Sequence, residues 1–193
     1  LINREVVPAI GCTEPIAVAL CVAKATETLG CKPEKIQALL SANILKNAMG
    51  VGIPGTGMIG LPIAIALGAL IGKSEYQLEV LKDSTPEAVE AGKKLIDSQA
   101  INIGLKYGIE EKLYIEIICE AEGKKATAII SGGHTNFVYV AHGEEVLVNK
   151  QAASSNEATS DDVELTLRKV YDFAMETPIE ELKFILETRN LNK

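Results

Sequence analysis

Apolar residues occupy nearly every position in the first half of a predicted helix over residues 13–29, TEPIAVALCVAKATETL. Thr13 suits its N-cap, Pro15 is tolerated in its first turn, and Gly30 is typical of the residue that ends a helix. A helix that is apolar on all sides belongs in the core of a protein. We therefore expect the first half of this helix to be buried.

Shorter elements follow in the next fifty residues. Residues 35–41 predict a short strand, and Ser41 is placed to cap a helix over 42–49. A glycine-rich loop then leads to an apolar helix that begins at Leu61, with a proline suited to its first turn. The chain over 1–75 is therefore expected to be mostly helical.

An alternating pattern replaces the helical one over residues 76–150. YQLEVL predicts a strand over 76–81, and the capping box from Ser84 to Glu87 opens a helix. Short turns separate four further alternating segments, which predicts antiparallel hairpins. These segments are 112–121, 125–131, 136–141 and 144–149.

Small polar residues over 149–160 predict a linker, and two amphipathic helices are expected over 161–176 and 177–189. Thr177-Pro178 is expected to open the second of these helices, with Glu180 completing a capping box. We therefore predict an α+β fold in three parts. They are a helical part over 1–75 with Cys12 and the glycine-rich loop, a helix on an antiparallel sheet over 76–150, and a linker with two helices over 151–193.

The composition is that of a soluble globular protein, with 47% hydrophobic and 23% charged residues and a net charge of -7. Nothing concentrates Lys or Arg to neutralise phosphates, which argues against a nucleic-acid partner. The four cysteines form no C-x-x-C pair and follow no secretory segment, which favours a reducing cytoplasm over a disulfide scaffold. The first residue is Leu, and ETRNLNK ends the chain directly behind a helical pattern, so we expect a fragment of a longer chain.

The longest uncharged run, over residues 48–72, raises the alternative of a membrane-associated protein. Only MIGLPIAIALGALIG is continuously apolar, and its 15 residues fall short of the roughly 20 that a spanning helix needs. We therefore expect a buried core helix and no membrane partner.

Cys12, in GCTEP, lies immediately before the first predicted helix. The positive end of the helix dipole is expected to lower the pKa of its thiol and to favour the thiolate, which binds iron or zinc or attacks an electrophile. The alternative is a small apolar residue that fills a gap. Cys21 and Cys119 lie on apolar faces and are predicted core residues, and Cys31 is predicted to be structural. Glu14 is either a general acid or base, or an anion that suits the helix start.

Asn43, Lys46 and Asn47 share one face of the predicted helix over 42–49. An ammonium group beside two amides suits the binding of a carboxylate and a neighbouring polar group. The alternative is a solvated helix face.

The glycine-rich loop spells G-x-G-x-x-G at Gly55, Gly57 and Gly60. Pro54 precedes it where a Rossmann strand should run, and no acid follows at the expected distance, so we reject dinucleotide binding. The N–H groups of the loop, with Thr56, remain candidates for meeting an anion at the start of the next helix. The alternative is a tight turn between two helices.

A double glycine precedes His134, Thr135 and Asn136 between two predicted strands. Three polar side chains are more than a hairpin requires, and histidine binds ligands or transfers protons near neutral pH. The alternative is an ordinary polar loop.

Taken together, PAIGCTEPIAVAL, NILKNAMGVGIPGTGMIG and SGGHTNF resemble the N-terminal half of the L-cysteine desulfidase family, a relative of the iron-sulfur L-serine dehydratase alpha chain. The motifs match in order and in approximate separation, and the resemblance covers essentially residues 1–193. The dehydratase alpha chain shares, more loosely, the element from Asn47-Ala48 to Gly60.

The resemblance implies a lyase that works without pyridoxal phosphate and holds a [4Fe-4S] cluster with three cysteines. Cys12 is implied as one ligand. The other two are implied in the missing C-terminal half, because Cys21, Cys31 and Cys119 match neither of them. The cluster is therefore expected in the full-length protein and not in this fragment, which we expect to be inactive alone.

The implied reaction converts L-cysteine to pyruvate, ammonia and sulfide. The open iron takes the substrate thiol as a Lewis acid while a base removes the α-proton. The catalytic candidates are Glu14, Lys46 and His134, and which of them is the base stays open. The substrate-binding candidates are Asn43, Asn47, Thr56, Gly57, Thr135 and Asn136.

Other readings also stay open. An L-serine dehydratase is one, and a non-enzymatic module that binds a small ligand without needing Cys12 is another. The expected partners are an amino-acid substrate and the missing half of the protein, and an assembly of identical copies is possible.

Overall fold

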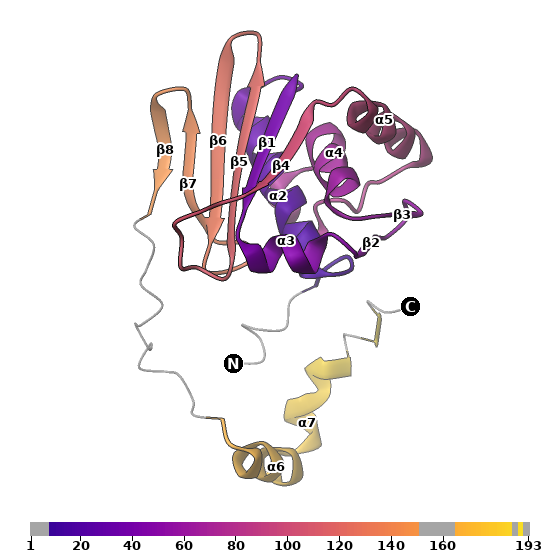
Figure 1. Cartoon of the computed structure of the whole chain (residues 1–193). Helices are drawn as coiled ribbons and strands as arrows, with labels where there is room; N and C mark the ends of the chain where they lie inside the picture. The colour runs from indigo at the N-terminus through magenta and orange to yellow at the C-terminus, as the bar shows by residue number, and fades with distance from the viewer. Residues whose placement is uncertain (1–7, 151–164, 187–188, 191–193) are drawn as a thin grey trace. The chain divides into compact units, whose positions relative to one another are not determined.

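The computed structural model describes residues 8–150, 165–186 and 189–190. Two units are distinguished (Figure 1): a sheet unit within residues 9–155, and a second unit that contains the C-terminal helices. Each is described by itself. The α+β class predicted from the sequence is confirmed.

The sheet unit contains helices, one 3-10 segment and strands. The helical elements are α2 (Thr13–Leu29), α3 (Ala42–Ala48), α4 (Leu61–Ile71), η1 (Ser74–Glu79) and α5 (Pro86–Asp97). The strands are β1 (Lys35–Leu40), β2 (Gly52–Ile53), β3 (Met58–Ile59), β4 (Ile101–Leu105), β5 (Tyr114–Ala121), β6 (Lys124–Ser131), β7 (Phe137–His142) and β8 (Glu145–Asn149).

Six strands form one sheet in the order β4-β1-β5-β6-β7-β8, and β2 pairs with β3 in a separate hairpin. The predicted hairpins from β5 to β8 are antiparallel, as expected. β1 pairs antiparallel with β5 but parallel with β4. The sheet therefore combines a strand from residues 1–75 with five strands from residues 76–150.

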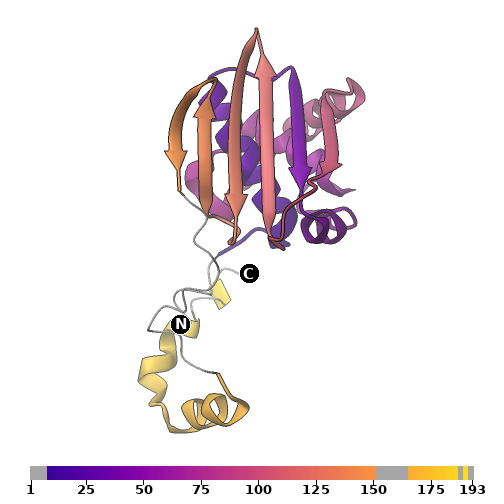
Figure 2. The same cartoon turned by 60° about the vertical axis from the view of Figure 1, so that its left-hand side comes forward.

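One face of the sheet is buried beneath α2 (Figure 2). Its fully buried side chains alternate along β1, β5 and β6, as a strand with one covered face requires. They are Ile36, Ala38, Leu40, Ile115, Ile117, Cys119, Ala126, Ala128 and Ile130. The opposite face of α2 packs against α4, which packs in turn against α5. The burial predicted for α2 is confirmed: every residue from Pro15 to Ala23 is buried.

Small residues allow α2 and α4 to approach closely. A Cβ atom added to Gly68 of α4 would lie 2.6 Å from the Ala19 carbonyl oxygen of α2. Real Cβ atoms essentially never come so near a backbone oxygen. The position therefore has no room for a side chain.

The ends of α2 agree with the sequence except for its cap. Gly30 ends the helix with a φ of 77° and donates its N–H to the Thr26 carbonyl at 3.1 Å. The N-cap is Cys12, however, and Thr13 is the first helical residue. The side chain of Cys12 accepts no cap hydrogen bond; its thiol donates to Glu14 instead.

The strand predicted over 76–81 is wrong. Residues 76–79 belong to η1 and residues 80–81 to the turn that follows, and Gln77 has φ 51° and ψ -125°, which breaks any extended run. Leu78 and Val80 are buried although no strand pairs with them. The alternating apolar residues in this sequence therefore do not indicate a strand. They hold an irregular segment against the core. The sequence also gave no indication of β4, which contains Gly104 and depends on parallel pairing with β1.

The cap of α5 lies one residue later than predicted. Thr85, not Ser84, is the N-cap, and its hydroxyl accepts the Ala88 N–H at 3.2 Å. The Ser84 hydroxyl is buried without a hydrogen-bond partner among the described residues.

This difference predicts a loss of stability for one of two neighbouring substitutions and none for the other. Thr85→Ala is expected to lower the free energy of unfolding by about 1 kcal/mol, because the Ala88 N–H loses its acceptor. Ser84→Ala is the matched control and is expected to cause no loss, since its hydroxyl makes no bond. Urea denaturation of both variants measures the difference. A larger loss for Ser84→Ala would place the cap at Ser84 after all.

The second unit contains α6 (Leu167–Glu176), α7 (Ile179–Leu182) and η2 (Lys183–Leu186). Thr166 caps α6 by accepting the Lys169 N–H at 3.2 Å. The capping box predicted at Thr177-Pro178 is wrong, because Pro178 has no side-chain acceptor and occupies the N-cap of α7. Most of the linker predicted over 149–160 lies outside the described residues.

Among the described residues, no helix combines the length and the apolar character needed to cross a membrane. The apolar α4 is 11 residues long and is buried at eight of them.

Candidate functional site

The arm that precedes α2 is fixed by contacts on two sides. The Ile10 N–H donates to the Leu78 carbonyl of η1 at 3.1 Å. Gly11 has a φ of 82°, and a Cβ atom there would lie 2.9 Å from Pro54 Cγ in the β2–β3 hairpin. Glycine alone accepts both that φ and that approach. The position of Cys12 is therefore set by η1 and by the hairpin together.

Two motifs that are distant in the sequence meet at the carboxylate of Glu14, and a third acts on it through space. Cys12 Sγ donates to Glu14 Oε2 at 3.0 Å, and Thr13 Oγ1 donates to the same oxygen at 3.4 Å. From α3, Asn47 Nδ2 donates to Glu14 Oε1 at 3.5 Å. His134, in the loop between β6 and β7, forms no hydrogen bond or ion pair with Glu14 and acts on the pKa of that carboxyl only through space. We call Cys12, Glu14, Asn47 and His134 the Glu14 cluster.

The electrostatics of the cluster differ from the sequence expectation. The hydrogen bond from Cys12 lowers the pKa of Glu14, and the interactions with His134 and Asn47 act in the same direction. The predicted lowering of the Cys12 pKa is wrong, because the hydrogen bond to Glu14 and partial burial raise it. A carboxylate in contact with a thiol disfavours a second negative charge, and this outweighs the helix dipole. At neutral pH the cluster therefore holds the proton on sulfur and the negative charge on Glu14.

The loop from Ser131 to Asn136 is closed by its own polar groups. Asn136 Nδ2 donates to the Ser131 carbonyl at 2.9 Å, and the Asn136 N–H donates to the Gly133 carbonyl at 3.2 Å. The Asn136 side chain thus shapes the turn that places His134. Thr135 is exposed at the turn, and His134 is half-buried.

The predicted polar face of α3 divides between two places. Ser41 caps the helix by accepting the Ile44 N–H, as predicted. Asn47 belongs to the Glu14 cluster, and Lys46 beside it is exposed. Asn43, one turn earlier, lines a separate depression of about 390 Å³ with the loop over 105–112.

The glycine-rich loop forms the β2–β3 hairpin. Thr56 Oγ1 donates to the Ile53 carbonyl at 2.7 Å and accepts the Met58 N–H at 3.0 Å. The hydroxyl group is therefore committed to the turn in this structure. Gly57 is exposed with a φ of 66°. At the end of the hairpin a Cβ on Gly60 would lie 2.7 Å from the Met49 carbonyl oxygen, so the hairpin lies close against the end of α3.

The other cysteines lie away from the cluster. Cys21 and Cys119 are fully buried, which confirms their core assignment. Burial raises the pKa of Cys21 well above its ordinary value and that of Cys119 to about 11. Cys31 is partly buried at the other end of α2. Among the described residues, no three His, Cys, Asp or Glu side chains are grouped so that they could hold a metal ion. Cys12 is therefore the one thiol that this part of the chain offers at the site.

Three residues that shape the site were not predicted from the sequence as site residues: Thr13, Pro54 and Leu78. The position of Thr13 between Cys12 and Glu14 was a usable signal, because a hydroxyl there reaches the same carboxylate. Pro54 and Leu78 gave no local signal, since each acts through a contact with a segment far away in the sequence.

No protein-family model matches the chain, and no solved structure matches it. The chain is 79% identical to a UPF0597 protein of Phocaeicola vulgatus and 77% identical to one of Bacteroides fragilis. It is 41% identical to a UPF0597 protein of Aeromonas hydrophila. Each of these matches covers 100% of the chain, but only 44–45% of the relative. The chain thus resembles UPF0597 proteins throughout and spans less than half of their length.

Proposed function

We propose that this chain is part of an iron-sulfur lyase, independent of pyridoxal phosphate, that converts L-cysteine to pyruvate, ammonia and sulfide. The observation that supports it most is the Glu14 cluster. A thiol and an amide from two separate motifs hydrogen-bond to one carboxylate at a helix start, and the imidazole of a third motif acts on that carboxylate through space. Those motifs are the ones that carry the resemblance to the L-cysteine desulfidases.

Cys12 is the proposed contribution of this chain to the [4Fe-4S] cluster. One thiol does not hold such a cluster, so the remaining ligands have to come from outside the chain described here. When bound, the cluster supplies a Lewis-acidic iron for the substrate thiol. A cysteine ligand binds as thiolate, so Cys12 must give up its proton first. Glu14 accepts the S–H hydrogen bond and is the adjacent group able to receive that proton.

Glu14 and His134 are the proposed proton-transfer groups of the site. Glu14 would pass the proton that it takes from Cys12 on to solvent when the iron-sulfur cluster binds, which leaves an ionised carboxylate able to accept a proton from a substrate carbon. Asn47 orients the carboxylate by donating to its second oxygen. The exposed ammonium group of Lys46, on the same short helix, is the proposed partner of the substrate carboxylate.

The test uses the complete protein to which this chain belongs, purified without oxygen. Sulfide and pyruvate are assayed from L-cysteine, and pyruvate from L-serine. We expect a brown protein that releases sulfide. Cys12→Ala should lose both colour and activity, whereas the matched control Cys31→Ala should keep both.

Glu14→Gln separates proton transfer from cluster binding. We expect it to keep the colour while activity falls by about 100-fold or more. If the protein converts L-serine as fast as L-cysteine, L-cysteine is not the specific substrate, but the assignment as a lyase still holds. A colourless complete protein that releases no sulfide would contradict the lyase.

A binding module is the second candidate, and one observation favours it. The raised pKa keeps the Cys12 thiol neutral, and a neutral thiol is a poor ligand and a poor nucleophile. In that case an amino acid would bind beside Lys46 and Asn47 without reaction. Binding of L-cysteine to a colourless complete protein, unchanged in Cys12→Ala, would support this alternative.

A further inference from the structure

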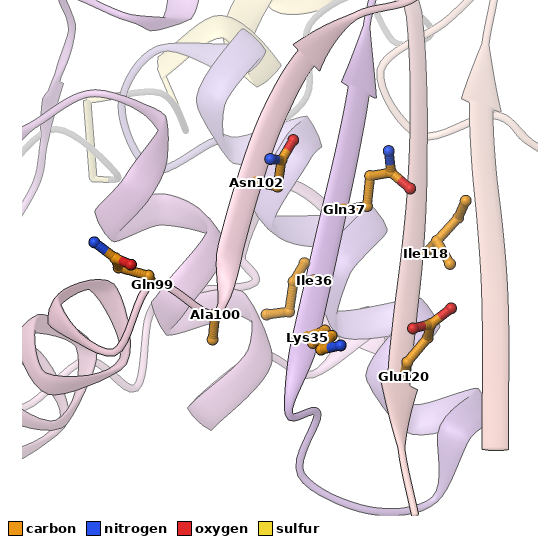
Figure 3. A pocket seen from close by; sticks show the side chains of 8 residues that line it. All are labelled: Lys35, Ile36, Gln37, Gln99, Ala100, Asn102, Ile118 and Glu120. Carbon is orange, nitrogen blue, oxygen red and sulfur yellow. The ribbon is translucent and has the colours of Figure 1, made fainter. Parts of the chain in front are cut away.

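A second polar hollow lies on the face of the sheet that α2 does not cover. It has a volume of about 310 Å³ and lies where β1 begins and β5 ends (Figure 3). Its polar lining comes from three strands and from the turn before β4. The polar side chains that line it are Lys35, Gln37, Gln99, Asn102 and Glu120, and the apolar side chain of Ile118 lies among them.

Strand register brings five of these side chains together. Gln37 of β1 lies opposite Asn102 of β4 on one side and opposite Ile118 of β5 on the other. Lys35 lies opposite Glu120 in the adjacent row of the same face. Side chains at directly opposite positions on neighbouring strands have Cβ atoms about 5 Å apart. The sheet therefore presents a cation and an anion beside two amides.

Gln99 completes the hollow from the turn between α5 and β4. Its φ of 58° lies in the left-handed region that favours glycine. Its N–H donates to the Ile96 carbonyl at 3.0 Å, which keeps the turn tight. Figure 3 shows its amide on the other side of β4 from Gln37, so the hollow has polar groups at both margins.

The polar side chains around the hollow have no interaction partners in the described part of the chain. Within the described part of the chain, no hydrogen bond or ion pair is formed by the side chains of Lys35, Gln37, Gln99, Asn102 or Glu120. This holds even for Lys35 and Glu120, which have opposite charges and are cross-strand neighbours. Such neighbours ordinarily attract each other. Their charges are therefore available to a third molecule.

We propose that this hollow, which we call the sheet-face pocket, binds a free α-amino acid with a polar side chain. Lys35 supplies a partner for the carboxylate and Glu120 a partner for the ammonium group. Gln37 and Asn102 both donate and accept hydrogen bonds, so they suit a hydroxyl or amide side chain, while Ile118 contacts its methylene groups.

Other ligand classes fit the sheet-face pocket less well. A simple anion such as phosphate would meet the charge of Glu120 as well as that of Lys35. A nucleobase would find no aromatic ring to stack on among the lining residues. A divalent cation would find a single carboxylate, where several oxygen ligands are needed. The pocket shares no residue with the Glu14 cluster, and the proposal does not depend on the proposed lyase.

L-glutamine is the probe for this proposal, titrated into the 15N-labelled 193-residue chain and followed by NMR. We expect saturable shifts of the side-chain amide signals of Gln37, Gln99 and Asn102. N-acetyl-L-glutamine lacks the ammonium group and L-glutaminamide lacks the carboxylate, so each should bind about tenfold more weakly or worse.

Variants assign the binding to the two charges. Lys35→Met and Glu120→Gln are each expected to weaken binding by about tenfold. The matched control is Lys125→Met, which removes an exposed lysine opposite Glu120 on β6 that does not line the pocket and should change binding little. Equal binding by all three variants would overturn the proposal. So would the absence of shifts at these amides, or shifts confined to the Asn47 and His134 signals.

Discussion

Replacing Gly68 by alanine is expected to lower the free energy of unfolding of the sheet unit by about 3 kcal/mol, the upper end of the usual cost of overpacking a core. The new methyl carbon would lie 2.6 Å from the Ala19 carbonyl oxygen and 3.1 Å from its Cα. Both are backbone atoms in the part of α2 that is fully buried, so neither can move without displacing α2. The better helix propensity of alanine offsets only about 1 kcal/mol of this destabilisation.

Gly92→Ala in α5 is the matched control. Its added Cβ would meet Ile63 Cδ1 at 3.0 Å, and that atom is the far end of a flexible side chain. We expect a change within about 1 kcal/mol, since the propensity gain and the side-chain adjustment nearly cancel. Urea denaturation, compared at equal m-values, measures both variants. Equal stability of the two would mean that α2 and α4 separate more easily than their close packing implies.

The second large effect is expected at the Glu14 cluster. Glu14→Gln removes the charge whose hydrogen bond raises the pKa of Cys12, so the pKa of the thiol should fall. A lower pKa gives more thiolate at neutral pH and faster alkylation. We expect the pH profile of the Cys12 alkylation rate to shift to lower pH, with a several-fold higher rate at neutral pH.

Iodoacetamide labelling of the 193-residue chain, read by peptide mass spectrometry, measures this rate. Cys31 in the same spectra is the internal control, because it lies at the other end of α2 and its rate should not change. Asn47→Ala leaves the Cys12–Glu14 hydrogen bond in place and should change the Cys12 rate less than Glu14→Gln does. An unchanged Cys12 profile in Glu14→Gln would show that the carboxylate does not control the thiol.

Local signals in the sequence were enough for the helices and the antiparallel hairpins. Gly30 ends α2 where it was expected, because a left-handed residue after a helix is a local requirement. The alternation from β5 to β7 was readable since each of these strands has one covered face, whereas β8 was predicted although none of its residues is buried. The same signal failed over residues 76–81, where buried Leu78 and Val80 alternate on irregular backbone.

The arrangement of the candidate site was not available from local patterns. Cys12, Asn47 and His134 were each singled out, but only the packing of α2 and α3 brings Cys12 and Asn47 to one carboxylate, on which His134 acts through space. The sign of the Cys12 pKa shift was missed for a related reason. The helix dipole is visible in the sequence, whereas the rotamer that places Glu14 on the thiol depends on the fold.

The position of β1 between β4 and β5 determines the order in which the protein can fold during synthesis. β1 leaves the ribosome early, but its partners are Ile101–Leu105 and residues in Tyr114–Ala121. Until those strands emerge, both edges of β1 are unpaired and the apolar surface of α2 has no sheet to cover it. Pairings between such distant segments form slowly and leave the nascent chain prone to aggregation. This unit is therefore expected to depend on chaperones more than its size alone would indicate.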